Sequence, residues 1–405
     1  MKKHSFRYLL TGQSMANLGD VFYIVSLIST IYLLTGSAFY MALLPFFNMS
    51  ARFLGALAAP HVMDRFALPQ LLAYSQGLKT ILLLALAVSY QQITQETILM
   101  TFLFVTGIAF LDGWASPASH ALIPRLVERE HLVKSNGYMG VVTQTIQLSA
   151  WPLGGILIAI SSAETLIWIT VGLYIAATLF AGMLFRLLRI STEESNPAEK
   201  DRRAGWKAIL RSPFLRVVTL VELIEVNAGV VWIAAIVYVY VAEVLQAGEP
   251  WWGYINSSYF AGLIAGGLIA IRVDQLLQRR AKQCVIITAY TAALATIVFG
   301  LISNPYLALL LSVLFGFVTQ LKGITLNTLV QTNVKEHLLP KVYAAQEAAS
   351  FSTYAVTTLL AGLLVDLAGV RIVFITAGVL LLGSALLLTL GQKTLDVKAG
   401  VSATG

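Results

Sequence analysis

The sequence has little of what soluble enzymes use for chemistry. It contains one cysteine, Cys284, which excludes an intramolecular disulfide, and this residue lies in an apolar run where it is expected to pack as a small side chain. The five histidines are scattered without the spacing of a metal site, and no G-x-x-x-x-G-K-[ST] phosphate-binding motif occurs. The sequence therefore predicts no metal centre, no cofactor, no ATPase and no enzyme of another kind.

Charge is also scarce. Only 12% of the 405 residues are charged, 58% are hydrophobic, and the mean hydropathy is +0.78. A soluble domain does not have this composition, whereas a membrane-spanning helix needs about 20 mostly apolar residues. The chain offers twelve such runs, at approximately 8–34, 39–63, 70–90, 97–121, 135–160, 164–188, 213–242, 250–272, 283–303, 305–331, 341–365 and 370–391.

Basic residues outnumber acidic ones, 27 to 20, and their placement explains the excess. If the N-terminus is cytoplasmic, 23 Lys and Arg residues lie in tails, loops or loop flanks on the cytoplasmic side and only Arg371 lies on the outer side, while Arg52, Lys79 and Lys322 lie within spans. The positive-inside rule then predicts that both termini are cytoplasmic, which agrees with an even number of crossings. The expected partner of this charge is the lipid bilayer, and no nucleic acid is expected.

The twelve runs fall into two sets of six. The polar segment 189–212 divides them and is interpreted as a linker with a short surface helix around Trp206. Residues match between the sets at an offset of 210: Asn17 and Gly19 with Asn227 and Gly229, Asp64 with Asp274, and Leu111-Asp112-Gly113 with Leu321-Lys322-Gly323. This pattern predicts an all-α membrane protein of two pseudo-symmetric six-helix bundles, 1–188 and 213–405 with a short cytoplasmic tail, which is the major facilitator fold.

Longer passages resemble one branch of that superfamily. They are NLGDVFYIVSLISTIYLLTGSAF, MDRF, ASPASHALIPRLVEREHLVKSNGY, LVQTNVKEHLLPKVYAAQEAASF and AGLLVDLAGVRIVF, in this order along the chain. Together they are similar to the macrolide-efflux-like branch of the drug:proton antiporters. The resemblance implies a transporter that exchanges small molecules for protons by alternating access, without a cofactor.

The resemblance also implies a latch in the cytoplasmic loops, at Asp64 and Arg65 and at the repeat-equivalent Asp274. The chain departs from the family pattern in two places. Pro60 stands where the loop signature usually has Gly, and Trp151 replaces the first Gly of the Gly-Pro-x-x-Gly pattern of span 5. Pro152 is still expected to bend that helix.

Asp20 lies inside the first span, where a bare carboxylate costs roughly 2.5 to 3.5 kcal/mol on insertion scales. Gln13, Asn17 and Asp20 are spaced four and three residues apart and share one helical face, which is expected to form the wall of a cavity. Two interpretations stay open. Asp20 either pairs permanently with Arg52 or Lys79, or couples transport to protons or to a cationic substrate.

Two further acids, Glu222 and Glu225, lie one turn apart in span 7. Carboxylates this close do not both ionise easily in a medium of low dielectric, so one is expected to hold a proton near neutral pH. The pair is therefore a candidate for proton exchange. The alternative is that both are hydrated or paired with Arg216 near the cytoplasmic interface.

Asp112 and Lys322 occupy repeat-equivalent positions and carry opposite charges. One hypothesis is a salt bridge between the two halves that closes the inner side of the transporter. The other is that each residue pairs within its own half.

Other polar or aromatic residues are candidates for lining a substrate cavity, with hydrogen bonding between helices as the alternative: Asn48, Gln144, Gln147, Trp151, Gln320, Asn327 and Gln331. The sequence predicts a monomeric secondary transporter in a bacterial cytoplasmic membrane that exports amphipathic or cationic small molecules in exchange for protons. The alternatives are an exporter of one peptide antibiotic or siderophore, and a lysophospholipid transporter in which Lys79 binds the headgroup.

Overall fold

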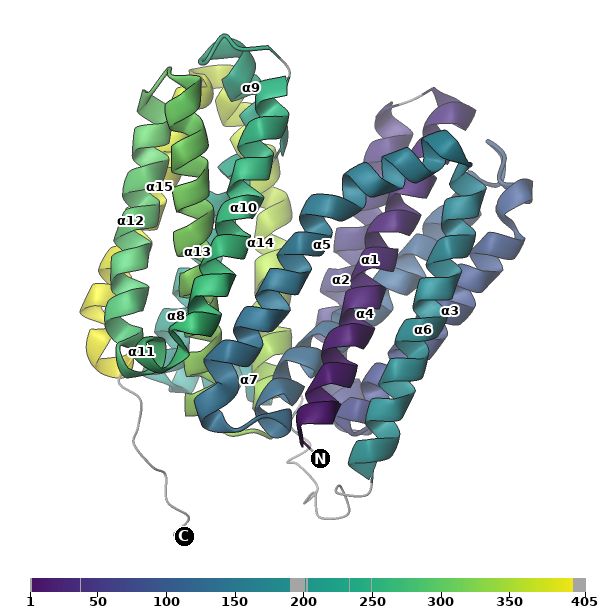
Figure 1. The fold of residues 1–405 in the computed structure, drawn as a ribbon, viewed down its shortest axis with the longest axis horizontal. Coiled ribbons are helices and arrows are strands. Elements are labelled where there is room, and N and C mark those ends of the chain that lie inside the picture. The colour runs from purple at the N-terminus through teal and green to yellow at the C-terminus, as the bar shows by residue number, and fades with distance from the viewer. Residues whose placement is uncertain are drawn as a thin grey trace. The chain divides into compact units, whose positions relative to one another are not determined.

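The computed structural model describes residues 2–36, 38–189, 201, 203–232, 234–248 and 250–395 (Figure 1). Within these residues every regular element is helical. Residues 190–200 and 202 of the predicted linker and residues 396–405 of the predicted tail lie outside the described residues. The first six spans are α1 (Lys2–Thr35), α2 (Ala38–Met63), α3 (Leu68–Val88), α4 (Ile98–Leu126), α5 (Leu132–Ile160) and α6 (Ala163–Arg189).

The second set begins with a broken span. It is followed by five long helices: α10 (Pro250–Arg272), α12 (Ala281–Leu301), α13 (Pro305–Asn333), α14 (Leu339–Ala368) and α15 (Val370–Leu390). Two short helices connect the spans. One, α7 (Ala204–Arg211), coincides with the surface helix predicted around Trp206, and the other, α11 (Asp274–Arg279), begins at Asp274.

Among the described residues, ten helices are long and apolar enough to cross a membrane, and one bent pair makes eleven. The remaining expected span is α2, whose 26 residues include Asn48, Arg52 and two prolines. At 26 residues it is long enough to cross a bilayer. The chain is a multi-pass membrane protein.

The helices form two compact units. Unit 1 is built from the described residues of 1–127, 145–206 and 340–351, and unit 2 from those of 128–144, 207–339 and 352–405. The units differ from the predicted bundles in two helices. Residues 132–144 of α5 belong to unit 2, and residues 340–351 of α14 belong to unit 1. Each of these two helices therefore contributes to both units.

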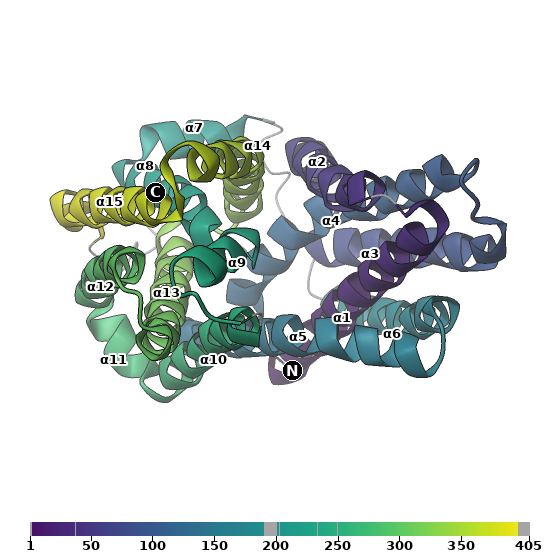
Figure 2. The ribbon, with the colours of Figure 1, turned by 90° about the horizontal axis from the view of Figure 1, so that it is seen from above.

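The predicted repeat is visible in the helix packing of each unit. In unit 1 the extensive contacts are α1 with α6, α2 with α4, α3 with α4 and α3 with α6. In unit 2 they are α8 (Pro213–Ala228) with α15, α10 with α13, α12 with α13 and α12 with α15. Figure 2 shows α12 beside α13 and α15, seen from above. An offset of 210 residues converts the first set of pairs into the second, one by one.

Span 7 differs from its prediction as one run over 213–242. It consists of α8 (Pro213–Ala228), the 3₁₀ turn η3 (Gly229–Trp232) and α9 (Ala234–Glu243), and it bends by 45°. The Trp232 ring stacks on Phe315 with centroids 4.3 Å apart and tilts against Phe299 at 4.7 Å. This aromatic packing in the core of unit 2 accompanies the break, which hydropathy alone does not signal.

Close approach of α2 and α4 depends on glycine. A Cβ added at Gly55 would lie 2.2 Å from the carbonyl oxygen of Phe110, and one added at Gly113 would lie 2.6 Å from that of Arg52. A backbone oxygen cannot move aside like the end of a flexible side chain. These glycines therefore set the distance at which α2 presents Arg52 to α4.

We expect Gly55→Ala to destabilise unit 1 by about 1–3 kcal/mol, because the added methyl group forces α2 and α4 apart. The measurement is the apparent melting temperature of the purified protein in detergent. Gly172→Ala on α6 is the matched control, since a Cβ there meets nothing within 4 Å. Equal melting temperatures for the two variants would contradict this account of the packing.

Candidate functional site

Four charged side chains from four helices meet inside unit 1. Asp20 comes from α1, Arg52 from α2, Lys79 from α3 and Asp112 from α4. Lys79 Nζ donates to Asp112 Oδ1 at 2.5 Å and to Asp20 Oδ1 at 3.2 Å. Arg52 Nη2 donates to Asp112 Oδ2 at 2.8 Å and lies 4.0 Å from Asp20 Oδ2. We call these four residues the charge network.

The two carboxylates of the charge network are held unequally. Asp112 has both cations within 2.8 Å, whereas Asp20 has its nearer cation at 3.2 Å and the other at 4.0 Å. Lys79 is the most deeply buried member, with 2% of its side chain exposed, while 30% of the Arg52 side chain is exposed. Asp112 is therefore the anchor of the charge network, and Asp20 is its more loosely paired carboxylate.

Tyr174 on α6 completes the site, and sequence reasoning missed it. Its hydroxyl donates to Asp20 Oδ1, and its ring lies 5.0 Å from Lys79 Nζ, within the range of a cation–π contact. Gly19 makes room for it, because an added Cβ would lie 2.8 Å from the ring. On α2, Asn48 donates to the hydroxyl of Tyr23 at 3.2 Å, so it contributes to helix packing beside the network.

Unit 2 has a smaller ion pair on the corresponding helices. Lys322 Nζ on α13 lies 2.7 Å from Glu225 Oε1 on α8, and Ser384 Oγ on α15 donates to the same oxygen at 2.8 Å. Ser384 is the counterpart of Tyr174 at the offset of 210. A search of the sixth and twelfth spans for paired hydroxyl groups would have found both residues.

Pairing with Arg216 was part of the alternative interpretation of the acids of span 7, and the structure does not have this pairing. Arg216 is exposed and makes no ion pair within the described part of the chain, and Lys322 takes its place beside Glu225. The carboxylate of Glu222, one turn earlier, has no hydrogen-bond or ion-pair partner among the described residues.

The sequence left two arrangements open for Asp112 and Lys322. In the structure Asp112 pairs with Lys79 and Arg52, and Lys322 pairs with Glu225. Each charge is therefore satisfied within its own unit, which is the second of the two arrangements. The postulated bridge between the halves is not formed by these contacts.

The candidate cavity residues separate into distinct groups. Gln13 and Asn17 line a narrow cavity in unit 1 together with Asp20, as their shared face predicted. Asn327 and Gln331 instead bond to Asn136 on α5, with the Asn136 Nδ2 to Gln331 Oε1 bond at 2.8 Å. Asn136, which sequence reasoning missed, thus joins α5 to α13 within unit 2. For Asn327 and Gln331 the structure therefore has the alternative, hydrogen bonding between helices.

The other candidates lie on α5 and α13. The amide nitrogen of Gln320 lies against Gly140 in unit 2. Gln144 and Gln147 are half-buried on α5, and Trp151 is 47% exposed. Pro152 is accommodated inside a helix that runs unbroken from Leu132 to Ile160.

The predicted latch residues have different surroundings. Asp64 pairs with Lys341 at 2.6 Å, at the start of α14 within unit 1. Lys341, another residue missed from sequence, also donates to the carbonyl oxygen of Asp201 at 3.2 Å. Arg65 is exposed, and Asp274 accepts a local bond from the Gln275 backbone at 2.8 Å. Only Asp64 therefore makes the long-range contact expected of a latch. No group of His, Cys, Asp and Glu fit for a metal ion occurs in the described part of the chain.

We expect Asp112→Asn to lower the apparent melting temperature more than Asp20→Asn does. Loss of Asp112 leaves Lys79 and Arg52 with only Asp20, at 3.2 and 4.0 Å, and breaking a buried ion pair costs about 3–5 kcal/mol. Melting in detergent, followed on both variants at the same pH, measures the difference. An equal or reversed order would contradict the assignment of Asp112 as the anchor.

Exchanging the charges of the unit 2 pair should preserve it. We expect Lys322→Glu and Glu225→Lys to be destabilising singly, because each places like charges together, and the double variant to recover most of the lost stability. The control is Asp112→Lys with Lys322→Asp, which should show no recovery. Thermal melting of monodisperse protein is the readout, and a double exchange no more stable than its single parents would refute the pairing.

Comparison with known proteins agrees with this architecture. The sequence profile of the Major Facilitator Superfamily matches residues 9–352. The MFS-type transporter YfmI of Bacillus subtilis is 30% identical over 383 residues, which cover 93% of this chain and 94% of that protein. The enterobactin exporter EntS of Shigella dysenteriae is 22% identical over 335 residues, which cover 82% and 78%.

A solved structure gives the same result for the fold. A bacterial homologue of the iron transporter ferroportin, crystallised in an outward-facing state, superimposes with a TM-score of 0.76 at 14% identity, covering 96% of this chain and 99% of that one. The predicted fold class is thereby confirmed. The family consists of membrane transporters and not of enzymes, and this chain belongs to the Major Facilitator Superfamily.

Proposed function

We propose that this transporter exports amphipathic or cationic small molecules from a bacterial cytoplasm by alternating access, in exchange for protons. The passages similar to the macrolide-efflux-like branch support this assignment. The distribution of basic residues supports a cytoplasmic position of both termini in the inner membrane.

The observation that carries the proposal is the unequal hold on the two carboxylates of the charge network. Asp112 lies within 2.8 Å of both cations. When Asp20 gains a proton, Lys79 and Arg52 therefore still have a close anion in Asp112. Ionisable groups inside membrane spans that are not fully locked in pairs mark proton or substrate pathways. Asp20 is therefore the first candidate for the proton-carrying residue.

Charge balance favours a cationic substrate. With Asp20 ionised, the two acids and two bases of the network cancel, and with Asp20 protonated the network carries one net positive charge. A cation in the transport cavity is repelled less by the neutral network than by the positive one. Its binding therefore favours release of the proton from Asp20, which is the linkage that an antiporter needs.

Unit 2 supplies a second candidate for proton handling. In the described part of the chain, Lys322 pairs with Glu225 at 2.7 Å, and no cation pairs with Glu222. Glu222 is thus the acid without a close counter-ion, one turn from a carboxylate. Such a group favours its neutral, protonated form in a medium of low dielectric.

A second function has one observation in its favour. Relatives that span 82% of this chain are named as enterobactin exporters, which makes export of one siderophore-like product the alternative. The lysophospholipid alternative loses its main argument. Lys79 was the expected headgroup ligand, but its side chain is 2% exposed and contacts two carboxylates.

The test is transport by the purified protein in proteoliposomes with an imposed pH gradient, using ethidium, a macrolide, enterobactin and a lysophospholipid as separate probes. We expect the gradient to drive movement of ethidium or the macrolide. Asp20→Asn should reduce this movement to the level of protein-free liposomes, because the exchangeable carboxylate is lost.

Asp366→Asn on α14 is the control, since it removes an exposed carboxylate from the same protein. Movement of enterobactin alone would favour the alternative. Gradient-driven transport by Asp20→Asn at the rate of the unaltered protein would refute the role of Asp20, and Glu222→Gln would then be the next variant to test.

A further inference from the structure

A narrow cavity runs inside unit 1 between α1, α3, α4 and α6. Tyr8, Leu9 and Leu184 lie at one end, and Asp20, Lys79 and Asp112 lie at the other. The space open to water is about 30 Å³. Because a water molecule needs roughly 10–15 Å³ by this measure, the cavity holds about two.

Small side chains leave this space open. Gly12 and Ala16 on α1, Ala115 on α4, and Ala177 and Ala181 on α6 all line the cavity. Their helices pack closely elsewhere, so larger residues at these positions would close it. With room for about two waters, the cavity is too small for an organic substrate.

Amide side chains are spaced along its length. Gln13 and Asn17 line it from α1, and Gln76 lines it from α3. Gln76 is 9% exposed, and its amide nitrogen is buried without a hydrogen-bond partner. A buried donor left unsatisfied costs about 1–3 kcal/mol, and in native structures such a group is normally bonded to protein or water. Water in the cavity would provide that partner.

The cavity connects the charge network with the Tyr8 end of α1. From Leu9 to Asp20 the axis of α1 rises about 16 Å. Two waters and three amide groups are available along this distance. Amide groups do not ionise, but they orient waters that pass protons along a chain.

We propose that this cavity is a proton path between the Tyr8 end of α1 and Asp20, separate from the route of the transported molecule. The proposal rests on the proton exchange proposed above and names the access route to the exchanging group. At its inner end Asp20 is faced by Arg52 from α2, Lys79 from α3, Asp112 from α4 and Tyr174 from α6.

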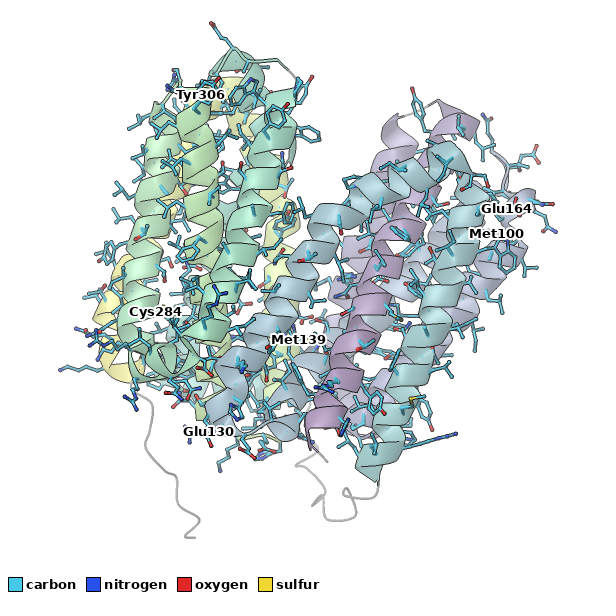
Figure 3. The ribbon with its side chains drawn as sticks, in the orientation of Figure 1. Met100, Glu130, Met139, Glu164, Cys284 and Tyr306 are labelled. Carbon is cyan, nitrogen blue, oxygen red and sulfur yellow. The ribbon has the colours of Figure 1, made fainter. Side chains whose placement is uncertain are left out.

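Access of water can be tested without any transport assay. Cys284, on α12 in unit 2 (Figure 3), is the only cysteine, so Cys284→Ser gives a cysteine-free background. Into it we would place Ala16→Cys or Ala115→Cys, which line the cavity, and as control Ala118→Cys, which is fully buried on α4 outside the cavity. The probe is the silver ion, which binds thiols and is close to water in size.

We expect silver added to the folded protein to protect the cysteines at 16 and 115 from alkylation after unfolding, and to leave the cysteine at 118 unprotected. Mass spectrometry of the alkylated protein measures this protection. Cysteines at 16 and 115 that are protected no better than the one at 118 would overturn the proposed water path.

The proton role is tested by Gln76→Leu, which removes the hydrogen-bonding amide at similar volume. We expect ethidium movement driven by a pH gradient to slow several-fold while ethidium binding is unchanged, and Gln76→Asn to restore most of the rate. Gln70→Leu, on the same helix outside the cavity, is the control. An unaltered rate in Gln76→Leu would overturn the proton path.

The two experiments separate this proposal from the one on which it rests. If the unaltered protein moves no ethidium and no other probe under the gradient, the proposed antiport fails, and the silver experiment still decides whether water reaches Asp20. If antiport is present and both cavity tests are negative, the proton path alone is refuted.

Discussion

The charge network of unit 1 is the constraint on which the rest of the site depends. Four ionised groups at bilayer depth have to satisfy one another, because lipid offers them no partner and each lone charge is costly. Lys79 and Arg52 are tolerated only where α1 places Asp20 and α4 places Asp112 beside them. This requirement constrains how each of the helices α1, α2, α3 and α4 is rotated about its own axis. Glycines at 19, 55 and 113 permit the close approach that these contacts need.

The two units share one pattern of helix packing but carry different charged residues. The same helix pairs pack in both, and a hydroxyl from α6 or α15 donates to an acid on α1 or α8 in each. The charges themselves differ. Unit 1 balances two acids with two bases, whereas unit 2 has Glu222 and Glu225 against Lys322. The repeat thus supplies the scaffold, and asymmetric substitutions give each half its own arrangement of charges.

Hydropathy and internal repetition predicted most of the fold, because span length and period are properties of the sequence itself. They also identified Arg52 and Lys79 as partners for Asp20. They did not predict that Asp112 joins the same network, since helix rotation and depth decide this and apolar runs do not encode them. Tyr174 was not predicted, because in the sequence it is one aromatic residue in an apolar helix. The break at Gly229–Trp232 was not predicted either, because it lies in a run that is hydrophobic throughout. Asn327 and Gln331 were predicted to line a cavity, but they form hydrogen bonds with Asn136 on α5. A polar residue in a span can bond a neighbouring helix instead of facing a cavity, and the sequence does not distinguish the two.

The central claim is that Asp20 exchanges its proton when a cationic substrate binds. The direct measurement is proton release from the detergent-solubilised protein on addition of ethidium, followed with a pH-sensitive dye in weakly buffered solution. The account predicts release by the unaltered protein and by Asp366→Asn, and none by Asp20→Asn that still binds ethidium. Equal proton release by Asp20→Asn would contradict it.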